Sequence, residues 1–197
     1  VSHYPKKEYW ADLLSRIQRK PGFSDRLSLD VYRLMFATGN LREGGDFMEM
    51  AQLALQAGLP AEAKKVVTEG FTKGVLGTGA EADRHKRLRD LANKQTDDDR
   101  KALVDDEKAA AAAKDGEALA KVGYAFVTNG EFDKGIAMIE QGIAKGGLKR
   151  AEDAKLHLGM AYLQANNRAK AVQVLRSVGG TDGAADLARL WIAQGGR

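Results

Sequence analysis

Three histidines are the side chains best suited to acid-base chemistry or metal binding: His3, His85 and His157. Catalysis needs at least two reactive groups within hydrogen-bonding reach, and a metal site needs several ligands. None of the three has a second histidine or a carboxylate cluster at metal-ligand spacing. His157 has one carboxylate on its expected helix face, Asp153, which predicts a surface pair. The sequence therefore predicts no enzyme activity, no metal and no cofactor. An active site would require the fold to form a pocket that brings His157 close to acidic residues from another part of the chain.

Two further features invite a ligand-binding interpretation. Acidic residues crowd at 97–99 and 105–107, but a calcium loop needs alternating ligands around a central glycine and a late glutamate. Glycine-rich strings at 77–79 and 179–183 lack the preceding strand and the lysine of a phosphate-binding loop. We interpret the acidic residues as the start of a helix and as part of its solvent-facing surface. His85 is expected on a similar charged, solvent-facing surface. The glycine-rich strings are interpreted as turns between helices.

The composition favours an all-α protein. The 197 residues are rich in Ala, Leu, Lys and Glu, contain three prolines and show almost no strand pattern. The net charge of +4 is a small surplus on a mixed surface rather than a basic stripe, so nucleic acid is not an expected partner. Cysteine is absent, which excludes disulfides and thiolate sites, and no apolar run is long enough to span a membrane.

The chain contains an internal repeat. Residues 122–143 align with residues 158–178 at a constant offset of 36, and residues 50–71 fit the same frame two periods upstream. A period in the mid-thirties is typical of a helical solenoid, in which stacked helix pairs share a core that no pair forms alone. The aligned positions are Gly123, Phe126, Gly130, Gly135, Ile139 and Gly142, then Gly159, Tyr162, Asn166, Ala171, Leu175 and Val178, and upstream Ala51, Ala54, Gly58, Ala63, Val67 and Gly70.

This pattern resembles the tetratricopeptide repeat. A small residue follows an apolar one in the first helix, an aromatic comes three residues later, Gly or Asn marks the turn, and small residues recur seven apart in the second helix. The resemblance implies an all-α fold, an α-α superhelix of about five helix hairpins plus a C-terminal capping helix. Gly123, Gly135 and Gly142 are expected where helices cross, because a side chain there would push the backbones apart, and Gly130 is expected in the turn.

We expect a single solenoid over residues 1–197. Two capping boxes, at 78–81 and 96–99, each predict the start of a charged helix. Trp191 is expected to seal the end of the core rather than to contact a ligand. The predicted order is an irregular helix pair at 1–43, a repeat unit at 44–77, an irregular charged helix pair at 78–115, repeat units at 116–149 and 152–180, and a capping helix at 181–197.

The resemblance also implies a binding surface, because tetratricopeptide proteins bind peptides or partner helices on a concave face lined by first helices. The strip is apolar and lacks the lysine and asparagine with which some family members clamp a terminal carboxylate. We expect it to hold an amphipathic helix or an extended peptide with apolar side chains. The alternative is that neighbouring or upstream repeats cover the strip. Carried over to this chain, it consists of Met48, Gln52, Leu55, Gln56, Ala120, Tyr124, Val127, Thr128, Leu156, Met160, Leu163 and Gln164.

The whole stretch is also similar to the C-terminal part of exported proteobacterial tetratricopeptide proteins. That resemblance implies a periplasmic setting, with the cytoplasm as the alternative. The leading hypothesis is a non-enzymatic scaffold that binds a protein or peptide. The rival hypothesis is an assembly module of a larger envelope polypeptide, with its groove filled by its own upstream repeats. The oligomeric state stays open.

Overall fold

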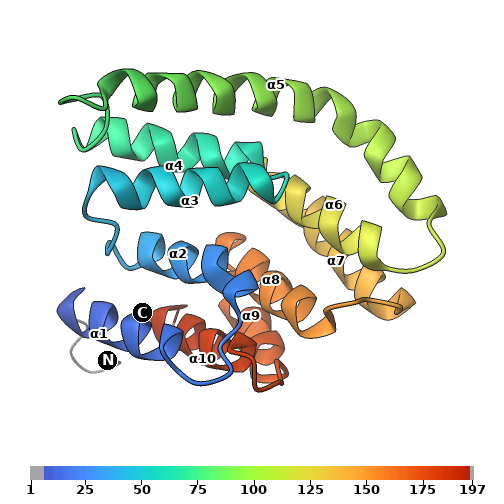
Figure 1. The fold of residues 1–197 in the computed structure, drawn as a ribbon. Helices are drawn as coiled ribbons and strands as arrows, with labels where there is room; N and C mark the ends of the chain where they lie inside the picture. Colours follow the sequence, from blue (N-terminus) through green and yellow to red (C-terminus); the bar gives the residue numbers. More distant parts are fainter. Residues whose placement is uncertain (1–6, 196–197) are drawn as a thin grey trace.

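Helices make up all the regular structure of residues 7–195, the part of the chain that the computed structural model describes. Successive helices pack against one another in chain order, which gives a solenoid-like array (Figure 1). The predicted all-α solenoid fold is confirmed. The elements are α1 (Lys7–Gln18), a 3-10 turn η1 (Asp25–Leu27), α2 (Ser28–Ala37), α3 (Gly44–Gln56), α4 (Pro60–Thr72), α5 (Ala82–Ala112), α6 (Glu117–Thr128), α7 (Phe132–Lys145), α8 (Ala151–Gln164), α9 (Arg168–Arg176) and α10 (Ala184–Gly195).

Three helix hairpins coincide with the stretches that carry the repeat: α3 with α4, α6 with α7, and α8 with α9. In each hairpin the aligned turn residue has a left-handed backbone, with φ of 73° at Gly58, 89° at Gly130 and 59° at Asn166. Glycine and asparagine adopt this conformation at lower cost than other residues. The shared turn position of the repeat therefore has a direct backbone cause, and the turn predicted at Gly130 is confirmed.

Helices α6 and α7 approach each other closely at two glycines. A Cβ atom added to Gly135 would lie 2.5 Å from the carbonyl oxygen of Gly123 and 2.6 Å from Val127 Cγ2. A Cβ added to Gly142 would lie 2.7 Å from the carbonyl oxygen of Gly116. The prediction that these glycines lie where helices cross is confirmed, because any side chain there would force the two backbones apart.

The charged region at 78–115 differs from its prediction. It forms the single 31-residue helix α5 instead of a helix pair. Thr96, expected to cap a second helix, is buried inside α5, and its hydroxyl donates to the carbonyl oxygen of Ala92 at a distance of 2.7 Å. Because that hydroxyl is satisfied within the helix, the acids at 97–99 simply continue along α5.

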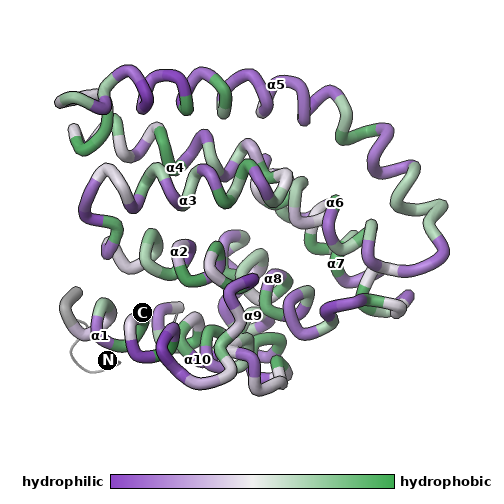
Figure 2. The backbone as a smooth tube through the Cα atoms, viewed as in Figure 1, coloured by the Kyte–Doolittle hydropathy of each residue, from purple (hydrophilic) through white to green (hydrophobic). Residues whose placement is uncertain are grey.

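Helix α5 links two parts of the core. Its length is about 46 Å for 31 residues at 1.5 Å per residue. Leu88 and Ala92 pack in one buried apolar cluster with α3 and α4, whereas Leu103 and Ala110 belong to a second cluster with α6 to α8. The rest of the helix is largely hydrophilic (Figure 2). The charged segment is therefore a continuous brace between two repeat units.

The two ends of the array meet, so that the solenoid closes on itself (Figure 1). Helix α10 packs against α2 as well as against α8 and α9. Trp10 and Leu14 of α1 and Val31 of α2 share a buried apolar cluster with Leu187 and Trp191 of α10. Trp191, predicted to seal the core, is buried in this cluster. Apolar packing therefore joins the first helices to the last.

Ion pairs reinforce the same junction. Lys20 Nζ lies 2.7 Å from Asp186 Oδ2 of α10. The Arg26 guanidinium lies 2.7 Å from Asp153 of α8 and 2.7 Å from Asp182, which precedes α10. These contacts join the segment between α1 and α2 to α8 and to the start of α10.

We predict that Gly135→Ala lowers the free energy of unfolding by about 2–3 kcal/mol, because the added methyl group must displace the backbone of α6. Urea denaturation followed by circular dichroism measures this loss. Gly45→Ala is the matched control, since a Cβ there meets nothing within 4 Å. It should leave stability unchanged or raise it by up to ~1 kcal/mol. Equal losses in the two variants would contradict the close approach of α6 and α7.

Candidate binding site

A buried arginine, Arg33, lies at the centre of the concave side of the array, which we call the inner face. The Arg33 side chain, from α2, is 4% exposed. Its Nη1 donates to Asp30 Oδ1 at 2.7 Å, and its Nε and Nη2 donate to the two carboxylate oxygens of Glu62 at 2.8 and 2.7 Å. The bidentate bond to Glu62 ties α2 to α4. Burial of a charge at this depth requires such pairing, since an unpaired ion inside a protein is strongly destabilising.

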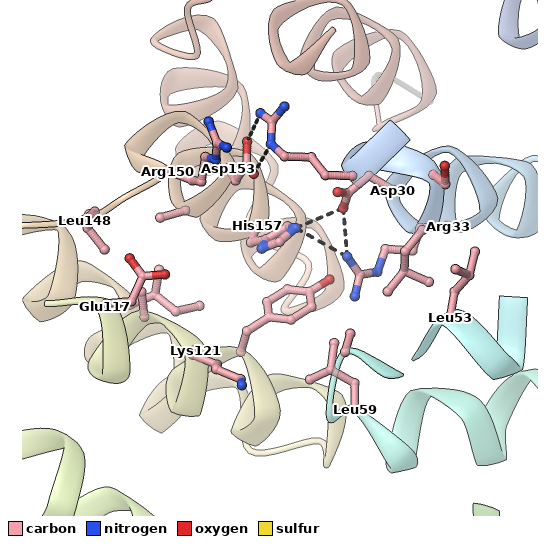
Figure 3. A pocket seen from close by; sticks show the side chains of 18 of the residues that line it. Asp30, Arg33, Leu53, Leu59, Glu117, Lys121, Leu148, Arg150, Asp153 and His157 are labelled. Carbon is pink, nitrogen blue, oxygen red and sulfur yellow. Dashed lines mark hydrogen bonds and ion pairs between the residues drawn. The ribbon is translucent and has the colours of Figure 1, made fainter. Parts of the chain in front are cut away.

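Two aromatic rings from later units complete this central cluster. The guanidinium of Arg33 lies 4.9 Å from the centre of the Tyr124 ring of α6. Tyr124 stacks on the ring of His157 of α8, with ring centres 4.7 Å apart. His157 Nε2 lies 2.9 Å from Asp30 Oδ1 (Figure 3). The central cluster of Asp30, Arg33, Glu62, Tyr124 and His157 thus joins α2, α4, α6 and α8.

The charges within the central cluster determine its protonation. Burial alone would raise the pKa of the Asp30 carboxyl, but the neighbouring His157 and Arg33 outweigh burial and hold that pKa below its usual value. Burial also raises the pKa of the Tyr124 hydroxyl, so this phenol stays neutral at physiological pH. Arg33 remains charged because Glu62 and Asp30 compensate its loss of hydration.

The pair formed by Arg33 and Tyr124 divides the inner face into two pockets, and both residues line each of them. The first pocket, about 420 Å³, lies among α2, α6, α8 and the turn between α3 and α4 (Figure 3). The second pocket, about 510 Å³, lies among α2, α4, α6, α8 and α10. Both volumes fall within the range of small-ligand sites, roughly 300–1,000 Å³.

The residues of the predicted binding strip differ in how deeply they are buried and in which pocket they line. Five of its members are buried: Met48, Tyr124, Val127, Leu156 and Met160. The members that line the second pocket are Tyr124, Val127, Thr128, Met160, Leu163 and Gln164. Ala120 lines the first pocket with Tyr124, whereas Met48, Gln52, Leu55, Gln56 and Leu156 line neither. Seven of the twelve strip residues thus line one of the two pockets, and five line neither.

Two predictions about histidines are wrong. Asp153 pairs with Arg26 instead of His157, and His157 reaches Asp30 of another unit because α2 folds back beside α8. His85 is buried rather than on a solvated face, and its Nδ1 accepts the backbone N–H of Gly77 at 3.1 Å. His3 lies outside the described residues.

The sequence interpretation missed Asp30, Arg33 and Glu62. One signal for the first two is present: an acid and a base three residues apart lie within an otherwise apolar helix face whose members Leu27, Val31 and Leu34 are buried. A charged pair on such a face predicts burial against a further polar partner. Glu62 carries no comparable signal, because acids are common in the first turn of a helix.

Within residues 9–195, no group of three or more His, Asp and Glu residues is arranged to hold a metal ion. Over the same residues, no helix has the length and apolar character needed to cross a bilayer.

We predict that Arg33→Leu lowers the free energy of unfolding by about 3–5 kcal/mol, because it leaves the carboxylates of Asp30 and Glu62 buried without their countercharge. Urea denaturation measures the loss. Arg16→Leu is the matched control, since Arg16 forms an exposed ion pair with Asp12; it should cost less than ~1 kcal/mol. Similar losses in both variants would contradict a central role for Arg33.

We also predict a pH dependence for Asp30→Asn. The pKa of Asp30 is lower in the folded chain than its value of about 3.9 in an unfolded chain. The carboxylate therefore contributes stability above about pH 4 that is lost as the pH falls further. The stability advantage of the wild type over Asp30→Asn should shrink between pH 6 and pH 3 in urea titrations. An advantage that stays constant over this range would refute the prediction.

Comparisons of the chain with protein-family models, with curated proteins and with solved structures gave no significant match.

Proposed function

We propose that this chain is a non-enzymatic binding module of the tetratricopeptide kind, which takes a short peptide segment of a partner protein in the second pocket. The observation that carries the proposal is the composition of this pocket. Its apolar lining combines the aliphatic side chains of Ala37, Val66, Val127 and Leu163 with aromatic and sulfur-containing ones, namely Phe36, Met50, Phe132, Met160 and Trp191. Such a lining accommodates an apolar side chain of a partner, with methionine adapting to its shape.

Amide and hydroxyl groups accompany the apolar lining. Thr128, Asn129, Gln164 and Gln194 also line the second pocket. The Thr128 hydroxyl and the Asn129 amide are already bonded within the chain, to Ala125 and to Asp99 and Arg100. Gln164 and Gln194 are therefore the amides that suit the N–H and C=O groups of a peptide backbone. A peptide in this pocket would bury an apolar anchor and keep its adjacent backbone hydrogen-bonded.

The charged residues that line the second pocket indicate which kind of residue lies next to the apolar anchor in the peptide. Arg33 is shared between the carboxylates of Asp30 and Glu62, whereas Lys65 is exposed and has no ion-pair partner within residues 9–195. An acidic residue next to the apolar anchor would supply the missing countercharge. The proposed ligand is therefore a short peptide with an apolar side chain followed or preceded by Asp or Glu.

The form of the ligand follows from the division of the inner face. The central cluster fills the middle of the concave surface, and five members of the predicted strip are buried. A long amphipathic helix would have to displace these contacts, whereas a short extended segment need not. The proposal places this binding in an exported, periplasmic setting, as the family resemblance implies.

A second candidate function, an assembly module of a larger polypeptide, is favoured by one observation. Helix α2 already lies against the first helices α6 and α8 through Arg33, Tyr124 and His157. Further repeats of the same polypeptide could cover the second pocket in the same way. If so, a longer version of the protein that includes upstream repeats would fail to bind peptides that this chain binds.

His157 lies within hydrogen-bonding distance of Asp30, which belongs to a different helix pair, and such an arrangement could in principle serve catalysis. An imidazole held by a carboxylate meets one requirement of a general base. The hydroxyl of Ser28, which also lines the first pocket, donates to the carbonyl oxygen of Asp25, and the Tyr124 hydroxyl stays protonated. We assign these residues to the packing of the helices and propose no reaction.

Displayed random peptides selected on the full chain test the proposal. We expect the selected peptides to share an apolar residue next to an acid. In a Trp10→Phe background Trp191 is the remaining tryptophan, so its fluorescence reports on the second pocket directly. Leu163→Glu should weaken binding at least tenfold, because a charge would face the apolar anchor.

The controls separate the pocket from the rest of the surface. Leu91→Glu replaces an exposed leucine of α5 that lines neither pocket, and it should leave peptide affinity unchanged. Lys65→Glu should weaken acidic peptides and favour variants in which Lys replaces the acid. Selected peptides that bind without changing Trp191 fluorescence, or equally well to Leu163→Glu, would overturn the proposal.

A further inference from the structure

The turn between α6 and α7 contains a chemically labile pair of residues. Asn129 is followed by Gly130, and asparagine deamidates most readily before glycine, which has no side chain to hinder attack by its backbone nitrogen. Asn129 is partly exposed and Gly130 is exposed, so water reaches this turn. Larger residues follow the other asparagines, because Asn40, Asn93, Asn166 and Asn167 precede Leu, Lys, Asn and Arg. Asn129 is therefore the asparagine of this chain with the greatest intrinsic tendency to deamidate.

Helix α5 holds the side-chain amide of Asn129. The amide nitrogen, Nδ2, donates to Asp99 Oδ2 at 3.1 Å and to the carbonyl oxygen of Ala125 at 3.0 Å. The amide oxygen, Oδ1, accepts from Arg100 Nε at 3.1 Å. Because both amide hydrogens and the amide oxygen are engaged, the side chain cannot rotate until these hydrogen bonds break.

The backbone of the turn holds the attacking nitrogen as well. The N–H of Gly130 donates to the carbonyl oxygen of Val127 at 3.0 Å. Asn129 caps the C-terminus of α6 with a helical φ of −82° and ψ of 0°. Deamidation requires the Gly130 nitrogen to reach Cγ of Asn129, so both reacting groups must first leave their native hydrogen bonds.

We propose that Asn129 is a deamidation site and that its contacts with α5 restrain the reaction. In this reaction the Gly130 nitrogen attacks Asn129 Cγ and a new C–N bond forms. The bond from Cγ to the side-chain nitrogen breaks, and that nitrogen leaves as ammonia with the proton of the Gly130 N–H. Water then opens the cyclic imide and leaves aspartate or isoaspartate at position 129. No oxidant or reductant takes part.

The product disfavours the native turn. A carboxylate at position 129 lies at the C-terminus of α6, where the helix dipole opposes a negative charge. It also faces the Asp99 carboxylate without a hydrogen to donate, and burial already raises the pKa of Asp99. Asn129 lines the second pocket, so deamidation adds a negative charge there whether or not that pocket binds the proposed peptide.

Peptide mapping by mass spectrometry tests the proposal on the full chain, incubated at mildly alkaline pH with and without urea. Deamidation is read from the mass of the peptide that contains Asn129 and from the formation of isoaspartate. In urea, Asn129 should react before the other asparagines. Without urea its rate should be at least roughly tenfold lower, because the turn must open before it can react.

Variants of α5 separate the specific restraint from general folding. Asp99→Ala and Arg100→Ala should each raise the rate at Asn129 in the folded chain by roughly threefold or more. Asp98→Ala is the matched control, since Asp98 is exposed and lies 3.9 Å from Lys101 of the same helix, and it should leave the rate unchanged. Hydrogen exchange of the α8 and α9 amides should stay the same in all three variants.

Three results would overturn the proposal. The first is an equal rate at Asn129 with and without urea, and the second is faster reaction of another asparagine in urea. The third is a rate in both Asp99→Ala and Arg100→Ala that is no higher than in Asp98→Ala, or that rises only in step with hydrogen exchange in α8 and α9.

Discussion

The need to neutralise one buried guanidinium constrains the rest of this structure. Arg33 lies among helices from four parts of the chain, at a depth where an unpaired charge would be severely destabilising. Glu62 supplies a bidentate partner from α4, and Asp30 supplies a second carboxylate that in turn holds His157 of α8. The helices cannot move apart without exposing or orphaning these charges. A local electrostatic requirement thus fixes the arrangement of segments that are distant in sequence.

This requirement changes the character of a repeat array. Units of a solenoid ordinarily contact only their neighbours, which leaves the concave face open along its length. Here the first helices fold back on the last ones through apolar packing around Trp10 and Trp191 and through the ion pairs of Arg26. The concave face becomes two separate pockets on either side of the contact between Arg33 and Tyr124. Ligands of limited size match such pockets better than a long helix does.

Local features of the sequence predicted the local features of the fold. The period of 36 residues located the three hairpins, and the crowding of α6 against α7 explains why glycine occupies positions 123, 135 and 142. The break predicted at 96–99 was wrong because a capping box and a buried threonine within a helix have the same residue pattern, and the apolar contacts of Leu88 and Leu103 decide between them. The fold-back of α2 was not predictable from periodicity, which reports contacts between neighbouring units only. Consequently the contact between Arg33 and Tyr124 was not predicted.

A double-mutant cycle on Asp30 and His157 tests the closure of the array most directly, because these residues are 127 positions apart and touch only if α2 folds back beside α8. The free energies of unfolding would be measured for the wild type, Asp30→Ala, His157→Ala and the double variant. A coupling free energy of about 1 kcal/mol or more is the predicted result. Additive effects, with a coupling below roughly 0.3 kcal/mol, would contradict the closed arrangement and the two pockets that depend on it.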